Sequence, residues 1–365
     1  MKNVMIVIGT RPEAIKMAPV YHELRSRSTL RTTLVVTAQH REMLDQVLNA
    51  LSLVPDADLD IMKNRQTINN IISAVLEKMP AVFESFKPDV LLVHGDTATT
   101  LASSLAAFHA GITVAHVEAG LRSWDKAAPF PEEVHRQMVD DIADIYFAPT
   151  TLSRANLLKE GKPEAAIHIT GNTAIDALKL TVREDYSSPD LDWAAGSRLI
   201  LLTAHRRENQ GAPMLSVFRA IRRIIDDFPD VKAIYPVHLN PVVREAANAV
   251  FGSGNERVRL IEPLDVIDFH NFLKRSYMTL TDSGGIQEEA PSLNVPVLVA
   301  RDVTERPEGI SAGTLKLVGT DEENVYNAIA ELLTNNELRE KMAKAPNPYG
   351  DGLASKRIAD ILEAL

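Results

Sequence analysis

Short runs of aliphatic and β-branched residues alternate with longer amphipathic stretches along most of this chain. This alternation predicts βα units, in which helices join parallel strands. The helix expected after the first strand shows the spacing most clearly, because Met17, Val20, Tyr21 and Leu24 recur at i, i+3, i+4 and i+7. Strands are expected at residues 4–8, 33–37, 90–94, 113–117 and 145–148, and again at 199–203, 233–237, 258–261, 278–281, 297–299 and 315–318.

The length and the repeated pattern predict two domains. At 365 residues the chain exceeds the size at which a single core usually keeps growing. A polar, turn-rich segment at residues 183–192 separates the two halves. We therefore expect an α/β fold with two Rossmann-like parallel-sheet domains whose boundary falls between about residues 170 and 197, and we assign them to residues 1–170 and 171–353. The last helix, residues 354–365, fits either domain, and packing back against the first is one of the two arrangements.

Composition narrows the functional classes. The chain has 45% hydrophobic and 24% charged residues, which is typical of a globular protein. It has no cysteine, which excludes disulfides, thiolate metal sites and a cysteine nucleophile. A net charge of −10 disfavours nucleic acid or an anionic membrane as the main partner. No apolar run approaches the roughly 18 to 20 residues of a membrane span, so a cytoplasmic location is expected by elimination.

Three acidic residues are the strongest chemical signal. Asp96 and Glu118 each follow a predicted strand, and Glu132 lies in Pro129-Phe-Pro-Glu-Glu. Ligands of open parallel sheets bind at the carboxyl ends of the strands, and carboxylates that converge there are suited to proton transfer. The alternative is that Asp96 caps the helix that begins near Thr97 and that Glu118 is a solvated loop acid. The matching places of the two residues favour a site.

Anion-binding features occur in both halves. The turn after the first strand, Gly9-Thr-Arg-Pro-Glu-Ala-Ile-Lys, puts Arg11 and Lys16 beside a helix start, although a structural βα turn would look the same. In Thr281-Asp-Ser-Gly-Gly-Ile-Gln-Glu-Glu, the backbone of Ser283–Gly285 suits a diphosphate and Glu289 suits the hydroxyls of a ribose. The alternative, an Asp/Ser helix cap followed by a glycine turn, leaves the glutamates unexplained.

His205 and His238 end two further predicted strands. Metal binding is the competing interpretation for a chain rich in histidine and carboxylate, but neither H-x-x-x-H nor H-E-x-x-H occurs. No metal and no cofactor are expected.

Ten sequence blocks together resemble the bacterial non-hydrolysing UDP-N-acetylglucosamine 2-epimerases, in the family's order from residue 1 to about 320. They are Gly9-Thr-Arg-Pro-Glu-Ala-Ile-Lys-Met-Ala-Pro, Gln39-His-Arg-Glu-Met-Leu, His94-Gly-Asp-Thr, His116-Val-Glu-Ala-Gly-Leu-Arg, Pro131-Glu-Glu, Gly171-Asn-Thr, His205-Arg-Arg-Glu-Asn, Tyr235-Pro-Val-His-Leu-Asn-Pro, Asp282-Ser-Gly-Gly-Ile-Gln-Glu-Glu-Ala-Pro and Thr304-Glu-Arg-Pro-Glu.

The resemblance implies a glycosyltransferase-B-like fold, with the two domains facing a central cleft, and a homodimer. It implies interconversion of UDP-GlcNAc and UDP-ManNAc for surface-polysaccharide or wall-polymer synthesis, by elimination of UDP to 2-acetamidoglucal and re-addition. The matching catalytic positions are Asp96, Glu118, Glu132 and His205. The matching UDP-binding positions are Arg11, Lys16, Phe269, Ser283, Gly284, Gly285, Glu289 and Arg306, with Phe269 acting through its backbone.

Many members of the family bind a second UDP-GlcNAc as an activator. Gln39, Arg65, Glu132 and His238 correspond to that site. The chain departs from the family at His135, where asparagine is usual, and at Ala127-Ala128, where the family has a more polar or aromatic stretch. Both departures concern the sugar and the second site rather than the chemistry. The rival functions are a hydrolysing epimerase that releases ManNAc and UDP, a glycosyltransferase of the same fold, and a UDP-sugar sensor.

Overall fold

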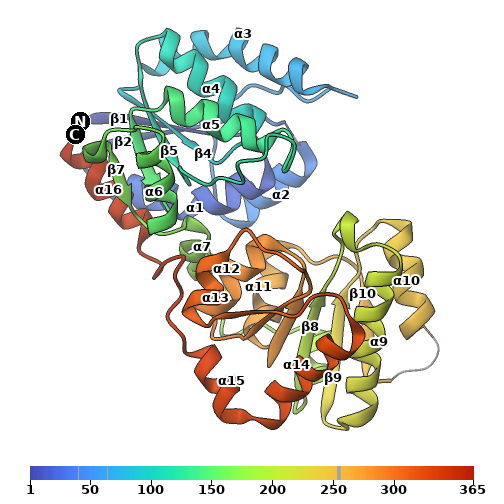
Figure 1. Cartoon of the computed structure of the whole chain (residues 1–365). Coiled ribbons are helices and arrows are strands. Elements are labelled where there is room, and N and C mark those ends of the chain that lie inside the picture. Colours follow the sequence, from blue (N-terminus) through green and yellow to red (C-terminus); the bar gives the residue numbers. More distant parts are fainter. Residues whose placement is uncertain (40, 64, 253–255) are drawn as a thin grey trace. The chain divides into compact units, whose positions relative to one another are not determined.

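The computed structural model of the chain describes residues 1–39, 41–63, 65–252 and 256–365. It forms two compact units, Met1–Leu180 with Tyr349–Leu365 and Thr181–Pro348. Each unit contains a parallel sheet with helices packed against it (Figure 1). The prediction of two Rossmann-like α/β units is therefore confirmed.

The first unit is built on a parallel sheet in the order β3-β2-β1-β4-β5-β6-β7. Its strands are β1 (Lys2–Ile8), β2 (Leu30–Val36), β3 (Ala57–Asp58), β4 (Val90–His94), β5 (Thr113–Val117), β6 (Ile145–Ala148) and β7 (Ile167–Ile169). Its helices are α1 (Arg11–Ser26), α2 (Arg41–Ala50), α3 (Ile68–Phe86), α4 (Ala98–His109), α5 (Glu132–Ile142), α6 (Thr151–Lys159), α7 (Thr173–Thr181) and α16 (Ala354–Ala364).

The second unit repeats the design with the strand order β10-β9-β8-β11-β12-β13, again all parallel. Its strands are β8 (Arg198–Thr203), β9 (Val231–Pro236), β10 (Val258–Ile261), β11 (Met278–Thr281), β12 (Val297–Val299) and β13 (Leu315–Leu317). Its helices are α8 (Pro189–Ala194), α9 (Ala212–Asp227), α10 (Pro241–Phe251), α11 (Val266–Lys274), α12 (Gly284–Ser292), α13 (Pro307–Ala312), α14 (Glu322–Thr334) and α15 (Asn336–Ala343).

The central strands contain continuous apolar runs because both of their faces are covered. Ile6 in β1 and Leu91 and Leu92 in β4 are completely buried, as are Ile200 and Leu201 in β8. A strand buried on both faces has no solvent side on which to place polar residues. This explains why the continuous aliphatic runs predicted these strands correctly.

In each sheet the strand order reverses beside the unit's first strand, between β1 and β4 and between β8 and β11. Ligands of open α/β sheets bind at the carboxyl ends of the strands at such a reversal. Gly9 follows β1 and Asp96 lies just beyond β4, while His205 and Asp282 lie just beyond β8 and β11. The topology therefore places predicted site residues of each unit at its expected binding edge.

The structure adds two strands that the sequence did not reveal. β3 has only two residues, at the sheet edge beside β2, and β7 has three, at the opposite edge beside β6. Runs this short cannot show a clear alternation of apolar and polar residues.

The first unit also extends beyond its expected boundary at residue 170, to residue 180, and takes up residues 349–353 with the last helix. The reason is a set of buried contacts around α7. The backbone N–H of Asn172 donates to the carbonyl of Tyr349 over 2.7 Å, and Asp176 accepts the N–H groups of Ala354 and Ser355 at the start of α16. These bonds join the chain's end to α7, and α16 lies beside α1 (Figure 1).

None of the helices in the described part of the chain combines the length and the hydrophobicity that crossing a bilayer demands.

We predict that Asp176→Ala destabilises the first unit by about 1.5–3 kcal/mol, because it removes a buried charged acceptor from the first N–H groups of α16. The chain's two tryptophans, Trp124 and Trp193, lie one in each unit, so a Trp193→Phe background lets fluorescence report denaturant unfolding of the first unit alone. Glu77→Ala, which removes an exposed carboxylate of the first unit, is the control. Equal stability of the two variants would contradict the docking role of Asp176.

Candidate active site

A pocket of about 410 Å³ in the first unit lies beside the turns that follow β1 and β4. It brings together three of the predicted site residues, Arg11, Asp96 and Glu132. Gln39, predicted for the second ligand site, and His135 line the same pocket. Arg11 comes from the start of α1, Asp96 from the β4–α4 turn, and Glu132 and His135 from α5. The start of α1, the β4–α4 turn and α5 are distant in sequence, and their predicted site residues meet in this pocket.

Asp96 is held by an arginine and does not cap the following helix. Thr97 provides the cap, because its hydroxyl accepts the N–H of Thr100 over 3.1 Å. The carboxylate of Asp96 instead accepts hydrogen bonds from the guanidinium of Arg136, with 3.0 Å from Nε to Oδ2. The capping alternative is therefore wrong, and Asp96 is a carboxylate paired with a cation at the pocket wall.

Glu118 is not a solvated loop acid, since it is only 9% exposed. Nζ of Lys16 lies 2.9 and 2.7 Å from its two oxygens, and Nε2 of His94 lies 2.8 Å from Oε2. Burial alone would raise the pKa of Glu118, but the charges of Lys16 and His94 outweigh it and hold this pKa well below its usual range. Glu118 is therefore an ionised, buried carboxylate.

Glu132 begins α5, so His135 and Arg136 follow it on the same helix face. The ring Nδ1 of His135 donates to the backbone carbonyl of Asp96 over 3.0 Å. One helix face therefore carries Glu132 and two side chains that hold Asp96 through its carbonyl and its carboxylate.

A buried glutamate joins the two turns of the pocket. Glu13 accepts the N–H groups of Gly9 (3.1 Å) and Thr10 (2.8 Å), and its second oxygen accepts the hydroxyl of Thr97 over 2.9 Å. Burial raises the pKa of Glu13, although its hydrogen bonds oppose the rise. A Cβ at Gly9 would lie 2.2 Å from the hydroxyl of Thr99, so the close approach requires glycine. Glu13 therefore fixes the β1–α1 turn, which leads into Arg11, against the start of α4.

In the second unit, Asp282 organises the turn that carries His205. Its Oδ2 accepts the backbone N–H groups of His205 and Arg206, each over 2.8 Å, and Oδ1 lies 3.4 Å from Nδ1 of His205. Burial lowers the pKa of His205, while the charge of Asp282 opposes the change. The ring of His205 stacks on that of His238, with centroids 5.4 Å apart. Two predicted histidines therefore do lie together.

The start of α12 combines a helix N-terminus with an arginine. Ser283 begins the helix without capping it through its side chain, so the helix-cap alternative does not hold. A Cβ at Gly284 would lie 3.3 Å from the guanidinium carbon of Arg306, so the glycine leaves room for this close contact. Arg306 also binds Glu288, with 2.7 Å from Nε to Oε1. This edge therefore offers backbone N–H groups and a guanidinium to an anion.

The remaining predicted residues are distributed as follows. Glu289, on α12, has its Oε2 3.4 Å from Nε2 of His270, and Phe269 on α11 is half-buried. Oε1 of Gln39 accepts the hydroxyl of Thr99 over 3.0 Å. Arg65 is exposed on the first unit.

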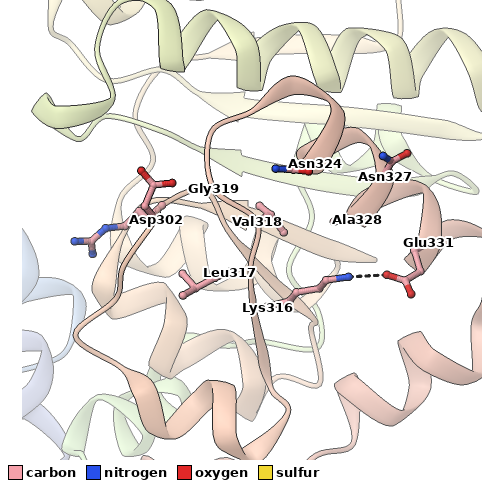
Figure 2. Close-up of a pocket in the computed structure, with 10 residues that line it drawn as sticks. Asp302, Lys316, Leu317, Val318, Gly319, Asn324, Asn327, Ala328 and Glu331 are labelled. Carbon is pink, nitrogen blue, oxygen red and sulfur yellow. Dashed lines mark hydrogen bonds and ion pairs between the residues drawn. The ribbon is translucent and has the colours of Figure 1, made fainter.

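A larger cavity, of about 620 Å³, lies on the second unit between the residues after β12, strand β13 and helix α14 (Figure 2). Its cations are already paired. Lys316 bonds to Glu331 over 2.6 Å, and Arg301 bonds to Glu305 over 2.8 Å. Burial alone would raise the pKa of Glu305, but its hydrogen bonds with Arg301 outweigh burial and lower this pKa to about 2. We assign no ligand to this cavity. Across the described residues, no group of three or more His, Asp or Glu side chains is placed to hold a metal ion.

Sequence reasoning missed the partners that hold the acids. The signal for Arg136 is a helix that begins at Glu132 and puts Arg136 one turn later on the same face. The contact of His94 with Glu118 joins neighbouring parallel strands, and a motif alone does not predict it. The place of Glu13, three positions into α1, is typical of a capping box.

Comparisons with known proteins agree on one family. A family model described as UDP-N-acetylglucosamine 2-epimerase matches residues 22–363. The chain is 60% identical over 360 residues to the UDP-N-acetylglucosamine 2-epimerase of Bacillus subtilis (strain 168), covering 99% of this chain and 94% of that protein. A crystal structure of UDP-N-acetylglucosamine 2-epimerase is 58% identical with a TM-score of 0.92, covering 99% of this chain and 96% of that one. The UDP-GlcNAc 2-epimerase from Neisseria meningitidis, solved bound to UDP-GlcNAc, is 44% identical with a TM-score of 0.88 and full coverage of both chains, 100% each.

We predict that Lys16→Met destabilises the first unit by about 1–3 kcal/mol at neutral pH, because it leaves the buried carboxylate of Glu118 short of a partner. The folded-state pKa of Glu118 is depressed, so its contribution to stability is present above the unfolded-state pKa and is lost as pH falls through the folded-state pKa. The difference between wild type and variant should therefore shrink as the solution is acidified.

Denaturant unfolding of the first unit, followed through Trp124 in a Trp193→Phe background over a pH series, measures this difference. Lys126→Met, which removes an exposed lysine, is the matched control. A cost that stays constant from neutral to acidic pH would show that the loss is one of packing and not of charge.

Proposed function

Because this chain belongs to the UDP-N-acetylglucosamine 2-epimerase family, we propose that it is a non-hydrolysing epimerase that interconverts UDP-GlcNAc and UDP-ManNAc. One observation carries the proposal beyond family membership. Arg11, Asp96 and Glu132 line one pocket beside the strand-order reversal of the first sheet, so two acids and a cation face the same ligand space.

The chemistry explains why several acids are needed. The C2 hydrogen of the sugar has no neighbouring carbonyl to stabilise a carbanion, so a carboxylate cannot simply remove it. Its removal must accompany cleavage of the C1–O bond, which releases UDP with the bonding electrons and forms the C1=C2 bond of 2-acetamidoglucal. Return of a proton to the opposite face of C2, with re-addition of the UDP oxygen to C1, completes the inversion. Acid–base groups are required on both faces, together with cations for the departing diphosphate.

The carboxylates that follow β4 and β5 are each paired with a cation. Asp96 is paired with Arg136, and Glu118 is paired with Lys16. The lowered pKa of Glu118 supports an ionised, proton-accepting form of this residue. Glu132, at the start of α5, supplies the third acid of the proposal. His205 is assigned to the active site as well, and the anchoring of its turn by the buried Asp282 supports a fixed position for its imidazole.

Lys16 couples ligand binding to the strength of the base. We assign it to the diphosphate, together with Arg11, Arg306 and the backbone of Ser283–Gly285. A lysine that turns toward a diphosphate gives less charge to Glu118, whose pKa then rises from its depressed value. A carboxylate with a higher pKa is a better proton acceptor, so the base gains strength when UDP-sugar is bound. Glu289 is assigned to the ribose, and the backbone of Phe269 to uracil.

We predict that Asp96→Asn, Glu118→Gln and Glu132→Gln each lower turnover at least about 100-fold, the lower end expected for loss of a general acid or base. Binding of UDP at the catalytic site, measured by calorimetry, should survive because none of the three acids is assigned to the UDP of that site. Glu77→Gln, an exposed glutamate on α3, is the control and should leave both quantities unchanged. Near-normal turnover in two of the three variants would remove the proposed proton path.

Product analysis separates the proposed function from its rivals. Phosphorus and proton NMR of UDP-GlcNAc incubated with the protein should show UDP-ManNAc growing in, with the sugar still attached to the nucleotide. Free ManNAc and UDP would identify a hydrolysing epimerase, and an unchanged UDP-GlcNAc spectrum would leave only a transferase or a sensor.

The proposal includes activation by a second UDP-GlcNAc, through Gln39, Arg65, Glu132 and His238. Gln39 and Glu132 line the same pocket, and His238 stacks on His205. A ligand that makes contacts in only one conformational state shifts the protein toward that state. Gln39 therefore shares a pocket with the proposed catalytic acids Asp96 and Glu132, and His238 contacts the proposed catalytic His205.

We predict that velocity against UDP-GlcNAc is sigmoidal and that the reaction from UDP-ManNAc alone is slow until some UDP-GlcNAc is present. Arg65→Ala should flatten the sigmoid without removing the chemistry, because Arg65 is exposed and is not assigned to proton transfer. Arg31→Ala, another exposed arginine of the first unit, is the control. Hyperbolic kinetics in the wild-type protein, without a lag from pure UDP-ManNAc, would mean that this member has no activator site.

The proposal also covers assembly and location. We assign the protein to the cytoplasm as a homodimer that supplies UDP-ManNAc for surface-polysaccharide or wall-polymer synthesis, without a cofactor. This assignment rests on the resemblance of the sequence blocks to the bacterial non-hydrolysing epimerases.

A further inference from the structure

A cluster of buried charges lies beside the turns that carry Asp96 and Glu118. It consists of His116 in β5, Asp140 in α5 and Arg122 in the segment between them. The side chains of all three are completely buried. Charges in such a place must be paired and hydrogen-bonded to be tolerated.

The hydrogen bonds of His116 use both of its ring nitrogens. Nδ1 lies 2.6 Å from Oδ1 of Asp140, and Nε2 lies 2.7 Å from the backbone carbonyl oxygen of Gly95. The other oxygen of Asp140 accepts the N–H of Gly120 over 3.1 Å and the guanidinium of Arg122 over 2.7 Å. These four hydrogen bonds connect His116, Asp140 and Arg122 to one another and to the backbone of Gly95 and Gly120.

The donors and acceptors determine the charge of His116. A carbonyl oxygen can only accept, so Nε2 must donate to Gly95. Asp140 is bound by the cation of Arg122 and by a backbone N–H, which keeps it an ionised carboxylate that can only accept, so Nδ1 must donate as well. A histidine whose two nitrogens both donate is an imidazolium.

The surrounding groups balance this charge. Arg122 also binds Glu160, with 2.6 Å from Nε to Oε1 and 2.5 Å from Nη2 to Oε2, so two cations face two carboxylates. The hydroxyl of Tyr146 donates to the backbone carbonyl of Asp140 over 3.0 Å, and burial raises its pKa to about 12, so it stays neutral. Burial alone would raise the pKa of Asp140, but His116 and Arg122 outweigh it and lower this pKa.

The cluster joins the two turns that carry the proposed bases. Gly95 directly precedes Asp96, and Gly120 lies two positions after Glu118. Gly95, Glu118 and Gly120 all have positive φ, at 67°, 69° and 84°. Such a backbone, above all at a glutamate, persists when the surrounding structure holds it in place. The hydrogen bond between His116 and Gly95 and the one between Asp140 and Gly120 hold these turns, and both belong to the same buried cluster.

We propose that His116, Asp140 and Arg122 are positioning residues: an imidazolium at His116 fixes the turn of Asp96 against the turn of Glu118, with Asp140 as the bridge. The positioning role rests on the proposed function, whereas the charge of His116 does not. A displacement of about 1 Å in a reacting group lowers the rate by up to about 100-fold. A buried ion cluster that fixes the distance between the two carboxylates therefore contributes to the rate.

The charge is tested by NMR of protein labelled with ¹⁵N-histidine, with the signals of His116 assigned through their absence in His116→Gln. Both ring nitrogens of His116 should carry a proton at neutral pH in the wild-type protein. In Asp140→Asn, His116 should lose a proton, because a buried cation beside Arg122 then lacks its carboxylate. One unprotonated nitrogen at His116 in the wild-type protein would overturn the proposal, even if the variant fails to fold.

The positioning role is tested by kinetics of Asp140→Asn against Asp141→Asn, its neighbour, whose side chain is 75% exposed. Asp140→Asn should lower kcat by up to about 100-fold and leave the Kd for UDP unchanged, because its bonds go to the turns of the acids. Asp141→Asn should change neither. Lower stability with an unchanged kcat would reduce the cluster to a structural role. The two proposals fail separately: a wild-type protein without turnover overturns the proposed function, whereas an active wild type with an equally active Asp140→Asn overturns the positioning role.

Discussion

Glu118, the carboxylate after β5, can remain ionised although it is buried, because the cation of Lys16 lies against it. Arg136 binds Asp96 from α5, and Lys16 binds Glu118 from α1. A buried carboxylate without such a partner would hold its proton and lose its value as a base. The packing of α1 and α5 around the sheet edge is therefore a chemical requirement of the site as well as a structural one.

The same principle, with different partners, organises the second unit. Asp282 follows β11 and is completely buried, yet it binds backbone N–H groups of the turn after β8 instead of a cation. In both units, a carboxylate beside the reversal of strand order accepts backbone N–H groups of a turn that carries predicted site residues. In the first unit Glu13 binds the turn that leads into Arg11, and in the second Asp282 binds the turn of His205.

Much of this arrangement was predictable from the sequence. Strands with aliphatic runs, such as residues 90–94, were located because both of their faces are buried. The sites of Asp96 and Glu118 followed, because each residue comes just after such a strand. The partners of these acids were not predictable in the same way. Lys16 and Glu118 are 102 positions apart, and Asp96 and Arg136 are 40 apart, so their pairing depends on how the helices pack. The boundary after residue 180 falls within the expected interval of about 170 to 197, but not at residue 170, because contacts of Asp176 with the last helix carry the first unit further.

The central claim is that carboxylates of the first unit move the C2 proton while UDP departs and returns. The most direct measurement is NMR of the UDP-sugars recovered after incubation of UDP-GlcNAc with the protein in deuterated water. The account predicts deuterium at C2 of the UDP-ManNAc that forms, because the removed proton is replaced by one that the solvent has exchanged. UDP-ManNAc that forms with its original hydrogen still at C2 would contradict the account, because inversion would then proceed without exchangeable acids and bases.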